Sequence, residues 1–292
     1  MLENPGLRAD APHLNGGGRA TGGREPAGEH PWRSRLLIRR ECEGKCSFAL
    51  RRRTTRLMRP SERGSDMELA GLVKIESDQP ELIDHAARVI SESFLEEPWY
   101  EEWLKAIDGS GATRERKLEI VTAAFRGEFR THAAYPAVYA TEDFAAIAGV
   151  FLASELRGAT HDELEEEGFL MYLPDLLTEE EMKLLAAAND ALTPVSEFSW
   201  IDKHVGENDY IYVYGWAVDS SKRGSGAFRR MVEPLFDKAD ELGVDIYLEC
   251  YSDRLQSLYE HVGFEVIETV SAPDIPIVER CMVRRAKTSR SR

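Results

Sequence analysis

A short glycine-rich loop in the last third of the sequence has the composition of an anion-binding turn. The loop, Lys222–Gly226 (KRGSG), follows a β-rich run, Tyr210–Val218, and precedes a helix expected to end at Leu242, before Gly243. Backbone N–H groups point outward at a helix N-terminus, and small residues let an anion approach them. Basic side chains at the same end, from Lys222 to Arg230, make the loop a candidate phosphate cradle, with a plain turn as the alternative. It is neither a Walker A loop nor the three-glycine dinucleotide fingerprint.

The residues around this loop resemble three ordered motifs of the GNAT superfamily of N-acetyltransferases. Residues 218–227 (VDSSKRGSGA) resemble the acetyl-CoA pyrophosphate loop V-x-P-x-x-[QR]-G-x-G-x-[GA]. Within residues 233–249, EPL, ADELG and YLE resemble the P-[VL]-L…A-D-x-x-G…Y-L-E series of one branch, which explains a proline at position 234. Residues 258–264 (LYEHVGF) resemble the L-Y-x-x-x-G-F ending. The segment before residue 137 fits the family only in outline.

The resemblance implies acetyl-CoA as cosubstrate and no metal. The Val218 N–H would polarise the thioester carbonyl, and the loop would hold the pyrophosphate. Two positions depart from the motif: Ser220 replaces a common proline, and Phe228 stands where a third small residue is usual. The Phe228 ring either narrows the cofactor site or packs between helix and sheet. The expected cofactor-binding residues are Val218, Lys222, Arg223, Gly224, Ser225, Gly226, Ala227, Phe228 and Ser252.

Two residues are expected to carry the catalytic chemistry. Acyl transfer to an amine needs a neutral nucleophile, a stabilised oxyanion and a proton for the departing thiolate. An alkylamine with a pKa of about 10.4 is mostly protonated at neutral pH. Because only the neutral amine attacks, a carboxylate, or water ordered by one, commonly removes its proton. Glu249, on a predicted strand facing the loop helix, is the candidate base, or else a carboxylate bonded to its neighbours. Tyr259 matches the family's general acid, or else is a core aromatic beside Phe264.

Other reactive side chains are weaker candidates. Trp216 and Tyr214 lie on the strand that should part to admit pantetheine, so they line the acceptor pocket or pack in the core. His204 and His261 have no placed partner, and Cys250 reads as a small buried apolar residue. The sequence therefore predicts no nucleophile–base pair, and direct transfer in a ternary complex is implied by the resemblance.

The net charge of −15 is unevenly distributed along the 292 residues. Residues 1–66 carry +6, residues 67–154 carry −8, residues 155–209 carry −12 and residues 210–292 carry −1. The acidity of residues 67–292 argues against a general nucleic-acid binder and against coating of anionic membranes. Asp162–Glu167 reads most simply as a solvated helix face, with an acidic rim for a cationic substrate as the alternative. No apolar run is long enough to span a bilayer.

The first 66 residues have the composition of a basic tail. Glycine clusters and scattered arginines cannot bury enough apolar surface to offset chain entropy, so we expect disorder, or an over-extended start with translation beginning at Met67. Cys42 and Cys46 have no second ligand pair nearby, so a metal site there is not expected. Four cysteines do not make a disulfide scaffold, and a cytoplasmic location is expected.

The remaining pattern predicts an α/β domain over residues 67–292. A strand is expected at 72–75, a helix after Asp78 as N-cap, a helix at 113–132, and strands at 137–140 and 146–152. Residues 155–209 form a helical acidic insertion, with a capping box at Thr178 and Glu181. The resemblance implies a mixed, mostly antiparallel central sheet flanked by helices.

The expected function is an acetyl-CoA-dependent N-acetyltransferase acting on an amine of a small, possibly cationic acceptor. The alternatives are a GNAT-fold acyl-CoA-binding or regulatory module without activity, and a nucleic-acid partner of the arginine-rich tail, which the charge of the remaining chain opposes. The acceptor itself and the oligomeric state have no signature in the sequence.

Overall fold

A computed structural model describes residues 67–196, 198–206 and 208–287. The expectations for residues 1–66, including the Cys42 and Cys46 pair, lie outside the described residues. The strands are β1 (Leu72–Lys74), β2 (Val138–Thr141), β3 (Ala146–Leu152), β4 (Tyr210–Val218), β5 (Asp245–Cys250), β6 (Glu265–Val270) and β7 (Glu279–Arg284). The helices are α2 (Pro80–Phe94), α3 (Pro98–Leu104), α4 (Arg114–His132), α5 (His161–Leu176), α6 (Glu179–Leu192), α7 (Asp202–Val205), α8 (Ala227–Leu242) and α9 (Asp253–His261).

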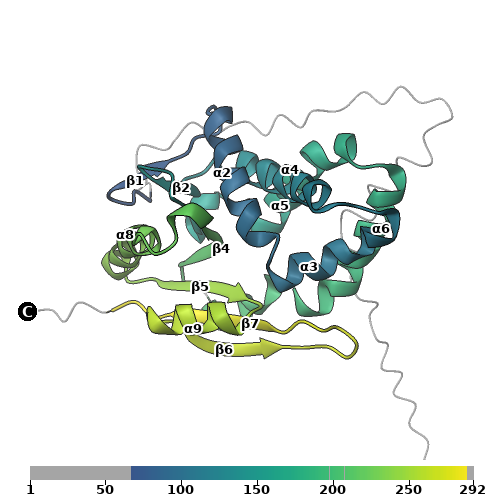
Figure 1. The fold of residues 1–292 in the computed structure, drawn as a ribbon. Coiled ribbons are helices and arrows are strands. Elements are labelled where there is room, and N and C mark those ends of the chain that lie inside the picture. Colours follow the sequence, from purple (N-terminus) through teal and green to yellow (C-terminus); the bar gives the residue numbers. More distant parts are fainter. Residues whose placement is uncertain (1–66, 197, 207, 288–292) are drawn as a thin grey trace, which may run out of the picture. The chain divides into compact units, whose positions relative to one another are not determined.

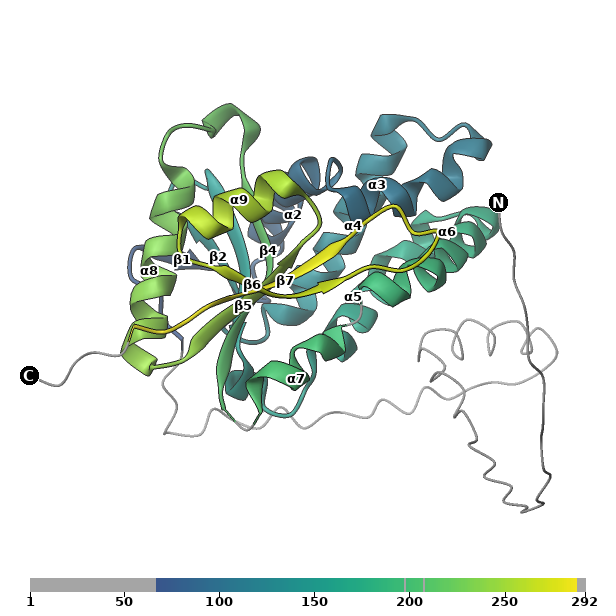
Figure 2. The same cartoon turned by 90° about the horizontal axis from the view of Figure 1, so that it is seen from below.

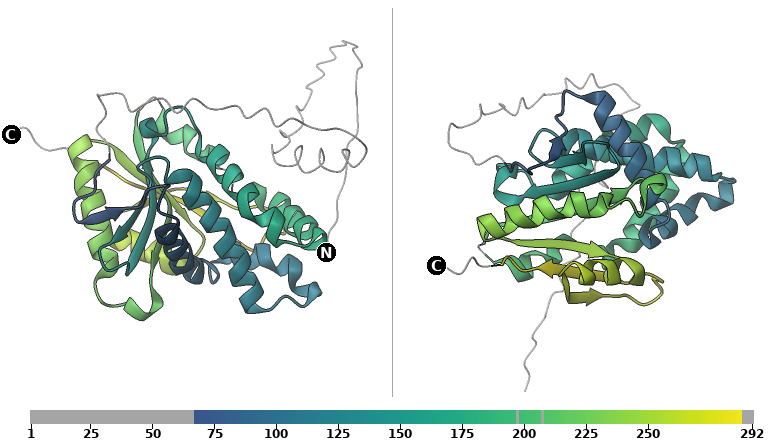
Figure 3. Two further views of the ribbon diagram at one scale, coloured as in Figure 1. Left: turned by 90° about the horizontal axis from the view of Figure 1, so that it is seen from above. Right: turned by 60° about the vertical axis from the view of Figure 1, so that its left-hand side comes forward.

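The strands form one sheet in the order β1-β2-β3-β4-β5-β7-β6. Neighbours pair antiparallel except β4 and β5, which are parallel, so the expected mixed and mostly antiparallel sheet is confirmed. Because successive side chains of a strand point to opposite faces, Val138 and Ala140 of β2 pack with α2 and α4, whereas Tyr139 packs with α8. The sheet therefore lies between α8 and the α2–α4 pair (Figures 1, 2 and 3).

β4 and β5 separate part of the way along their length. They pair only from Tyr210–Asp245 to Tyr212–Tyr247, although β4 continues to Val218 and β5 to Cys250. The separation begins where β4 carries a bulge: Gly149 of β3 faces Gly215 and Val150 faces Val213, which leaves Tyr214 without an opposite residue. A bulge bends its strand and increases the local twist. The bend opens a gap between the C-terminal halves of β4 and β5.

Helix α5 of the acidic insertion packs tightly across α4 (Figure 1). The contact depends on two glycines, because a Cβ at Gly127 would lie 1.9 Å from the Gly168 carbonyl oxygen. Asp162, Glu163 and Glu167 are exposed, as expected for a solvated face. The interpretation is wrong for Leu164, which is buried, and for Glu165 and Glu166, which are half-buried. The close approach of the helices turns one side of the acidic run toward the protein interior.

Most local expectations are confirmed, with two exceptions at the N-terminal helices. Thr178 and Glu181 form the expected capping box, and Gly243 in the left-handed conformation ends α8. The expectation that Asp78 caps α2 is wrong: Gln79 is the N-cap, because Pro80, which has no N–H to satisfy, takes the first helical position. Helix α3 was not predicted. Within the described residues, every helix is too short or too polar to traverse a bilayer.

Candidate active site

The glycine-rich loop forms a tight turn that leads into α8. A 3-10 turn, Ser220–Lys222, follows β4, and both Gly224 (φ 80°) and Gly226 (φ 78°) adopt the left-handed conformation. No side chain caps the first N–H groups of α8, and Lys222 and Arg223 are exposed beside them. The turn is held from behind by Arg230, which donates to the Ser225 carbonyl at 3.2 Å and to Asp143 at 2.8 Å. Uncapped N–H groups with nearby cations suit a pyrophosphate.

The end of β4 presents a backbone donor to the gap. The Asp219 N–H donates to the Ala145 carbonyl at 3.0 Å, on the β3 side. Consecutive N–H groups along a strand alternate between its two edges. The Val218 N–H therefore points to the edge from which β5 has separated, the position expected for a donor to the thioester carbonyl.

An aromatic cluster fills the space beneath the loop. Trp216 makes edge contacts with Phe228 and Tyr259, at ring-centroid distances of 5.6 and 5.8 Å, and Tyr259 also lies 5.9 Å from Phe264. The Phe228 ring thus packs between helix and sheet, one of its two expected fates. Burial raises the pKa of the Tyr259 phenol well above its ordinary value. Ser252 caps α9, accepting from the Leu255 N–H at 3.4 Å.

Glu249 lies on β5 at the same gap. Its carboxylate accepts a hydrogen bond from the buried Tyr212 hydroxyl of β4. Burial raises the pKa of Glu249 to about 7, and the Tyr212 hydrogen bond opposes part of this rise. A carboxylate with a pKa near the working pH is suited to act as a general base.

Two further carboxyl groups share this region, and neither was predicted. Glu165 of α5 and Glu128 of α4 interact electrostatically with each other and with Glu249. Burial first, then Asp162 and Glu249, raises the pKa of Glu165 to about 7. Burial first, then Glu165 and Glu249, raises the pKa of Glu128 well above its usual range. No lysine or arginine is among the groups that shift these three carboxyls. The interior beside the gap therefore carries acidic groups without a basic side chain to neutralise them.

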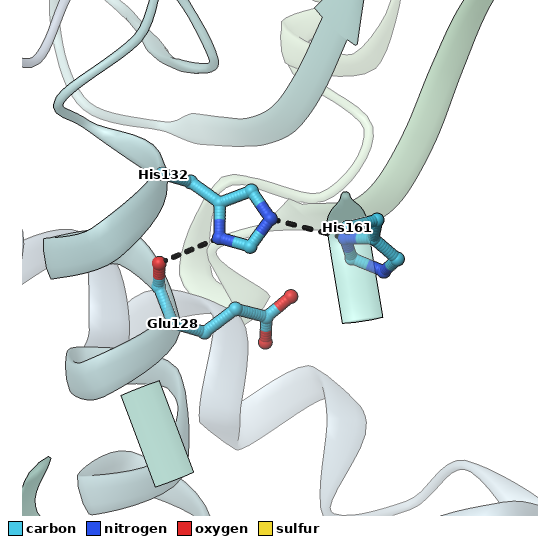
Figure 4. A group of neighbouring side chains, drawn as sticks. All are labelled: Glu128, His132 and His161. Atoms are coloured by element: carbon cyan, nitrogen blue, oxygen red, sulfur yellow. Dashed lines mark hydrogen bonds between the residues drawn. The ribbon is translucent and has the colours of Figure 1, made fainter. Parts of the chain in front are cut away.

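A buried histidine pair lies next to these acids. His132 Nδ1 lies 2.8 Å from the backbone carbonyl oxygen of Glu128, and His132 Nε2 lies 3.0 Å from His161 Nδ1 (Figure 4). The Tyr214 ring packs on both, with centroids 4.5 Å from His132 and 5.4 Å from His161. The i, i+4 spacing of Glu128 and His132 on a helix was a usable sequence signal. The position of His161 beside them is visible only in the folded structure.

The remaining candidates lie apart from this group. His204 pairs with Glu268 at 2.9 Å, and His261 is exposed at the end of α9. Glu97, at the N-terminus of α3, is a further acid missed from sequence: burial raises its pKa to about 7, and it acts electrostatically on Tyr259. Cys250 is buried as expected, and burial raises its pKa to about 12.

Comparisons with known proteins show which family and which relative the sequence resembles. Residues 155–264 match the model of the Acetyltransferase (GNAT) family. An uncharacterised N-acetyltransferase of Schizosaccharomyces pombe is 33% identical over 75 residues, which is 26% of either chain, so the match spans about a quarter of that relative. The similarity to the GNAT family therefore extends over residues 155–264.

Solved structures align over a longer span at lower identity. A structure described as histone acetyltransferase HPA2 and related acetyltransferase, from Corynebacterium glutamicum, is 16% identical, covers 75% of this chain and 98% of its own, and has a TM-score of 0.45. A putative arylalkylamine N-acetyltransferase of the yellow fever mosquito, Aedes aegypti, is 13% identical, with 74% and 87% coverage and a TM-score of 0.47.

Proposed function

We propose that the protein is an acetyl-CoA-dependent N-acetyltransferase that acetylates an amine of a small cationic acceptor by direct transfer in a ternary complex. The observation that carries this proposal is the separation of β4 from β5. The glycine-rich turn lies at the end of β4, and Glu249, with a pKa of about 7, lies on β5. A thioester placed in the gap would have a backbone donor on one side and a base on the other.

The residues of the turn fit coenzyme A. The left-handed Gly224 and Gly226 leave space above the uncapped N–H groups of α8, where a Cβ would meet nothing within 4 Å. Two exposed cations, Lys222 and Arg223, stand beside this space. We assign the pyrophosphate to residues 222–228 and the thioester carbonyl to the Val218 N–H.

The acidic interior supports a cationic acceptor. An alkylamine is protonated in solution at neutral pH, so it would enter as an ammonium ion. Glu165 and Glu249 are half-buried, and no lysine or arginine of the described residues is among the groups that shift their pKa values. A bound ammonium would stabilise their ionised forms. Residues 155–209, whose charge is −12, add to this attraction. A polyanionic acceptor such as a nucleic acid is disfavoured for the same reason.

In the proposed reaction, Glu249 takes a proton from the bound ammonium, and the free amine nitrogen attacks the thioester carbonyl carbon. The Val218 N–H stabilises the oxyanion of the tetrahedral intermediate. As the intermediate collapses, the C–S bond breaks, and the thiolate receives a proton from Tyr259. The nitrogen of the new amide loses its remaining extra proton, which restores the Tyr259 phenol, and Glu249 releases its proton to solvent. The described cysteines, Cys250 and Cys281, are buried with raised pKa values, which disfavours an acyl-cysteine intermediate.

The test is release of free CoA thiol across an amine panel, with the product identified by mass spectrometry. Cadaverine and lysine form a matched pair, because they share the same aminoalkyl chain and differ by one carboxylate. We expect kcat/KM to be at least about tenfold higher for cadaverine than for lysine, because the carboxylate of lysine would face the acidic side chains of Glu165 and Glu249. Acetyl-CoA binding without acetylation of any amine would favour the non-catalytic module. Absence of acetyl-CoA binding would refute both.

A further inference from the structure

Three side chains with metal-binding atoms converge between α4 and α5. Glu128 and His132 are one turn apart on α4, and His161 is the first residue of α5. All three are buried, and one ligand atom from each lies within 4.8 Å of the others (Figure 4). The tight glycine crossing of the two helices holds His161 against the α4 pair. The proposed transfer chemistry uses none of these three side chains.

The hydrogen bonding of His132 prepares its other nitrogen for a ligand. Nδ1–H donates to the Glu128 backbone carbonyl at 2.8 Å, so Nε2 carries the lone pair. Metal-binding histidines are commonly oriented in this way, by a carbonyl or carboxylate that accepts from the second nitrogen. Without an ion, the lone pair accepts from His161 Nδ1–H at 3.0 Å.

The spacing of the two imidazoles is close to that of a shared ion. Zn–N bonds of about 2.0–2.1 Å in a tetrahedral site place two nitrogens roughly 3.3 Å apart, so the observed separation needs to widen by only a few tenths of an ångström. Two imidazoles and one carboxylate are donors that suit zinc and similar first-row ions.

The charge balance of the cluster also favours a cation. Within the described part of the chain, the buried Glu128 carboxyl has the acidic groups of Glu165 and Glu249 as its electrostatic neighbours. A divalent ion would supply the missing positive charge.

We propose that Glu128, His132 and His161 bind one divalent transition-metal ion, Zn²⁺ or an ion of similar ligand preference, which joins α4 to the insertion helix α5. On binding, the Glu128 carboxyl releases its proton, and His161 moves its proton from Nδ1 to Nε2 so that Nδ1 can ligate. Water occupies the fourth position. The ion would fix the insertion helix beside the acceptor region.

The test measures metal binding directly, without acetyl-CoA or an acceptor, so its outcome is separate from that of the proposed function. Full-length protein with Cys42→Ser and Cys46→Ser removes the thiols of the N-terminal segment. After chelator treatment it is titrated with Co²⁺, followed by visible d–d absorption, and then with Zn²⁺ to displace the cobalt. We expect one equivalent bound, and a higher Tm with Zn²⁺.

The ligand variants are Glu128→Gln, His132→Gln and His161→Asn, each in that background. Loss of a residue that only hydrogen-bonds to a metal ligand weakens metal binding by up to about 100-fold. Loss of a ligand itself should therefore weaken metal binding by more than this. His204→Asn is the matched control, because His204 contacts Glu268 outside the cluster. Where a variant fails to fold, X-ray absorption of the Zn²⁺-loaded parent tests the same assignment by its two-imidazole signature.

Binding lost in the three ligand variants and kept in His204→Asn supports the proposal. No stoichiometric binding by the parent, or binding unchanged by all three substitutions, overturns it in favour of a metal-free histidine pair. A zinc shell without two imidazoles overturns it as well.

Discussion

The two sides of the gap between β4 and β5 are built in different ways. The side proposed to bind the cofactor, called the cofactor side, is one continuous stretch, residues 218–228, in which a strand end, a turn and a helix start follow each other directly. The side proposed to bind the acceptor, called the acceptor side, includes Glu128 of α4, Glu165 of α5 and Glu249 of β5. The first depends on local backbone conformation, whereas the second depends on helix crossing and burial. Changes to the two sides should therefore have separable effects.

The largest effect is expected for Glu249→Gln. The amide keeps the shape of the side chain and can still accept from Tyr212, but it cannot take a proton. We expect kcat/KM for the acceptor to fall about 10²–10⁴-fold, with the Kd for acetyl-CoA unchanged, as measured by steady-state kinetics and calorimetry. Glu268→Gln, a change at a half-buried residue of β6 that pairs with His204, is the control. A full loss in Glu97→Gln but not in Glu249→Gln would move the base to Glu97.

The pH dependence of kcat/KM also tests the acceptor side, through the titration of Glu249. The raised pKa of Glu249, about 7, means that its carboxylate is lost as the pH falls through 7. We expect kcat/KM to be level above about pH 8 and to fall at least tenfold per unit below about pH 6. Glu165, whose pKa is also about 7, titrates in the same window, whereas the raised pKa values of Tyr212 and Tyr251 keep both phenols protonated there. A flat profile between pH 5 and 8 would contradict the assignment.

Gly168→Ala should disturb the helix crossing on the acceptor side. Its Cβ would lie 2.5 Å from the Glu128 backbone nitrogen, so α4 and α5 must move apart. We expect a loss of about 2 kcal/mol in the free energy of unfolding and a Tm lower by roughly 5 °C, with acetyl-CoA affinity retained. Gly109→Ala, where a Cβ meets nothing within 4 Å, is the control. Equal Tm values for the two variants would refute the tight crossing.

Gly226→Ala addresses the cofactor side. The left-handed conformation costs an alanine roughly 1–2 kcal/mol, so the turn should relax and acetyl-CoA affinity should fall about tenfold. Gly243→Ala imposes the same penalty at the other end of α8. It should lower stability to a similar extent and leave the Kd for acetyl-CoA unchanged. Equal affinity losses would show that the effect is general destabilisation.

A smaller effect on turnover than that of Glu249→Gln is expected for Tyr259→Phe. The raised pKa of Tyr259 makes it a weaker acid than a thiol with a pKa of about 8.5, so its contribution should lie at or below the lower limit for acid catalysis, about 10²-fold. Phenylalanine preserves the contacts with Trp216 and Phe264. We expect lower kcat with little change in acetyl-CoA affinity. An unchanged kcat would leave Tyr259 with a packing role alone.

The sequence by itself determined the cofactor side and most element boundaries. The turn at Gly224–Gly226, the end of α8 at Gly243 and the capping box at Thr178 depend on backbone preferences that neighbouring residues impose. The placement of Glu249 on a strand was predicted for the same reason. Its raised pKa was not, because that shift comes from burial by elements distant in the chain.

Only the tertiary structure decided what the acidic insertion does. A run of glutamates is normally solvated, and nothing in its spacing distinguishes Glu165 from its neighbours. The crossing of Gly168 over Gly127 turns Glu165 and His161 toward Glu128 and His132, which are 29 or more positions away. Local preferences fix the conformation of each segment, whereas the electrostatics of the acceptor side arise from packing between segments. The cofactor turn was therefore predictable, and the histidine–glutamate cluster was not.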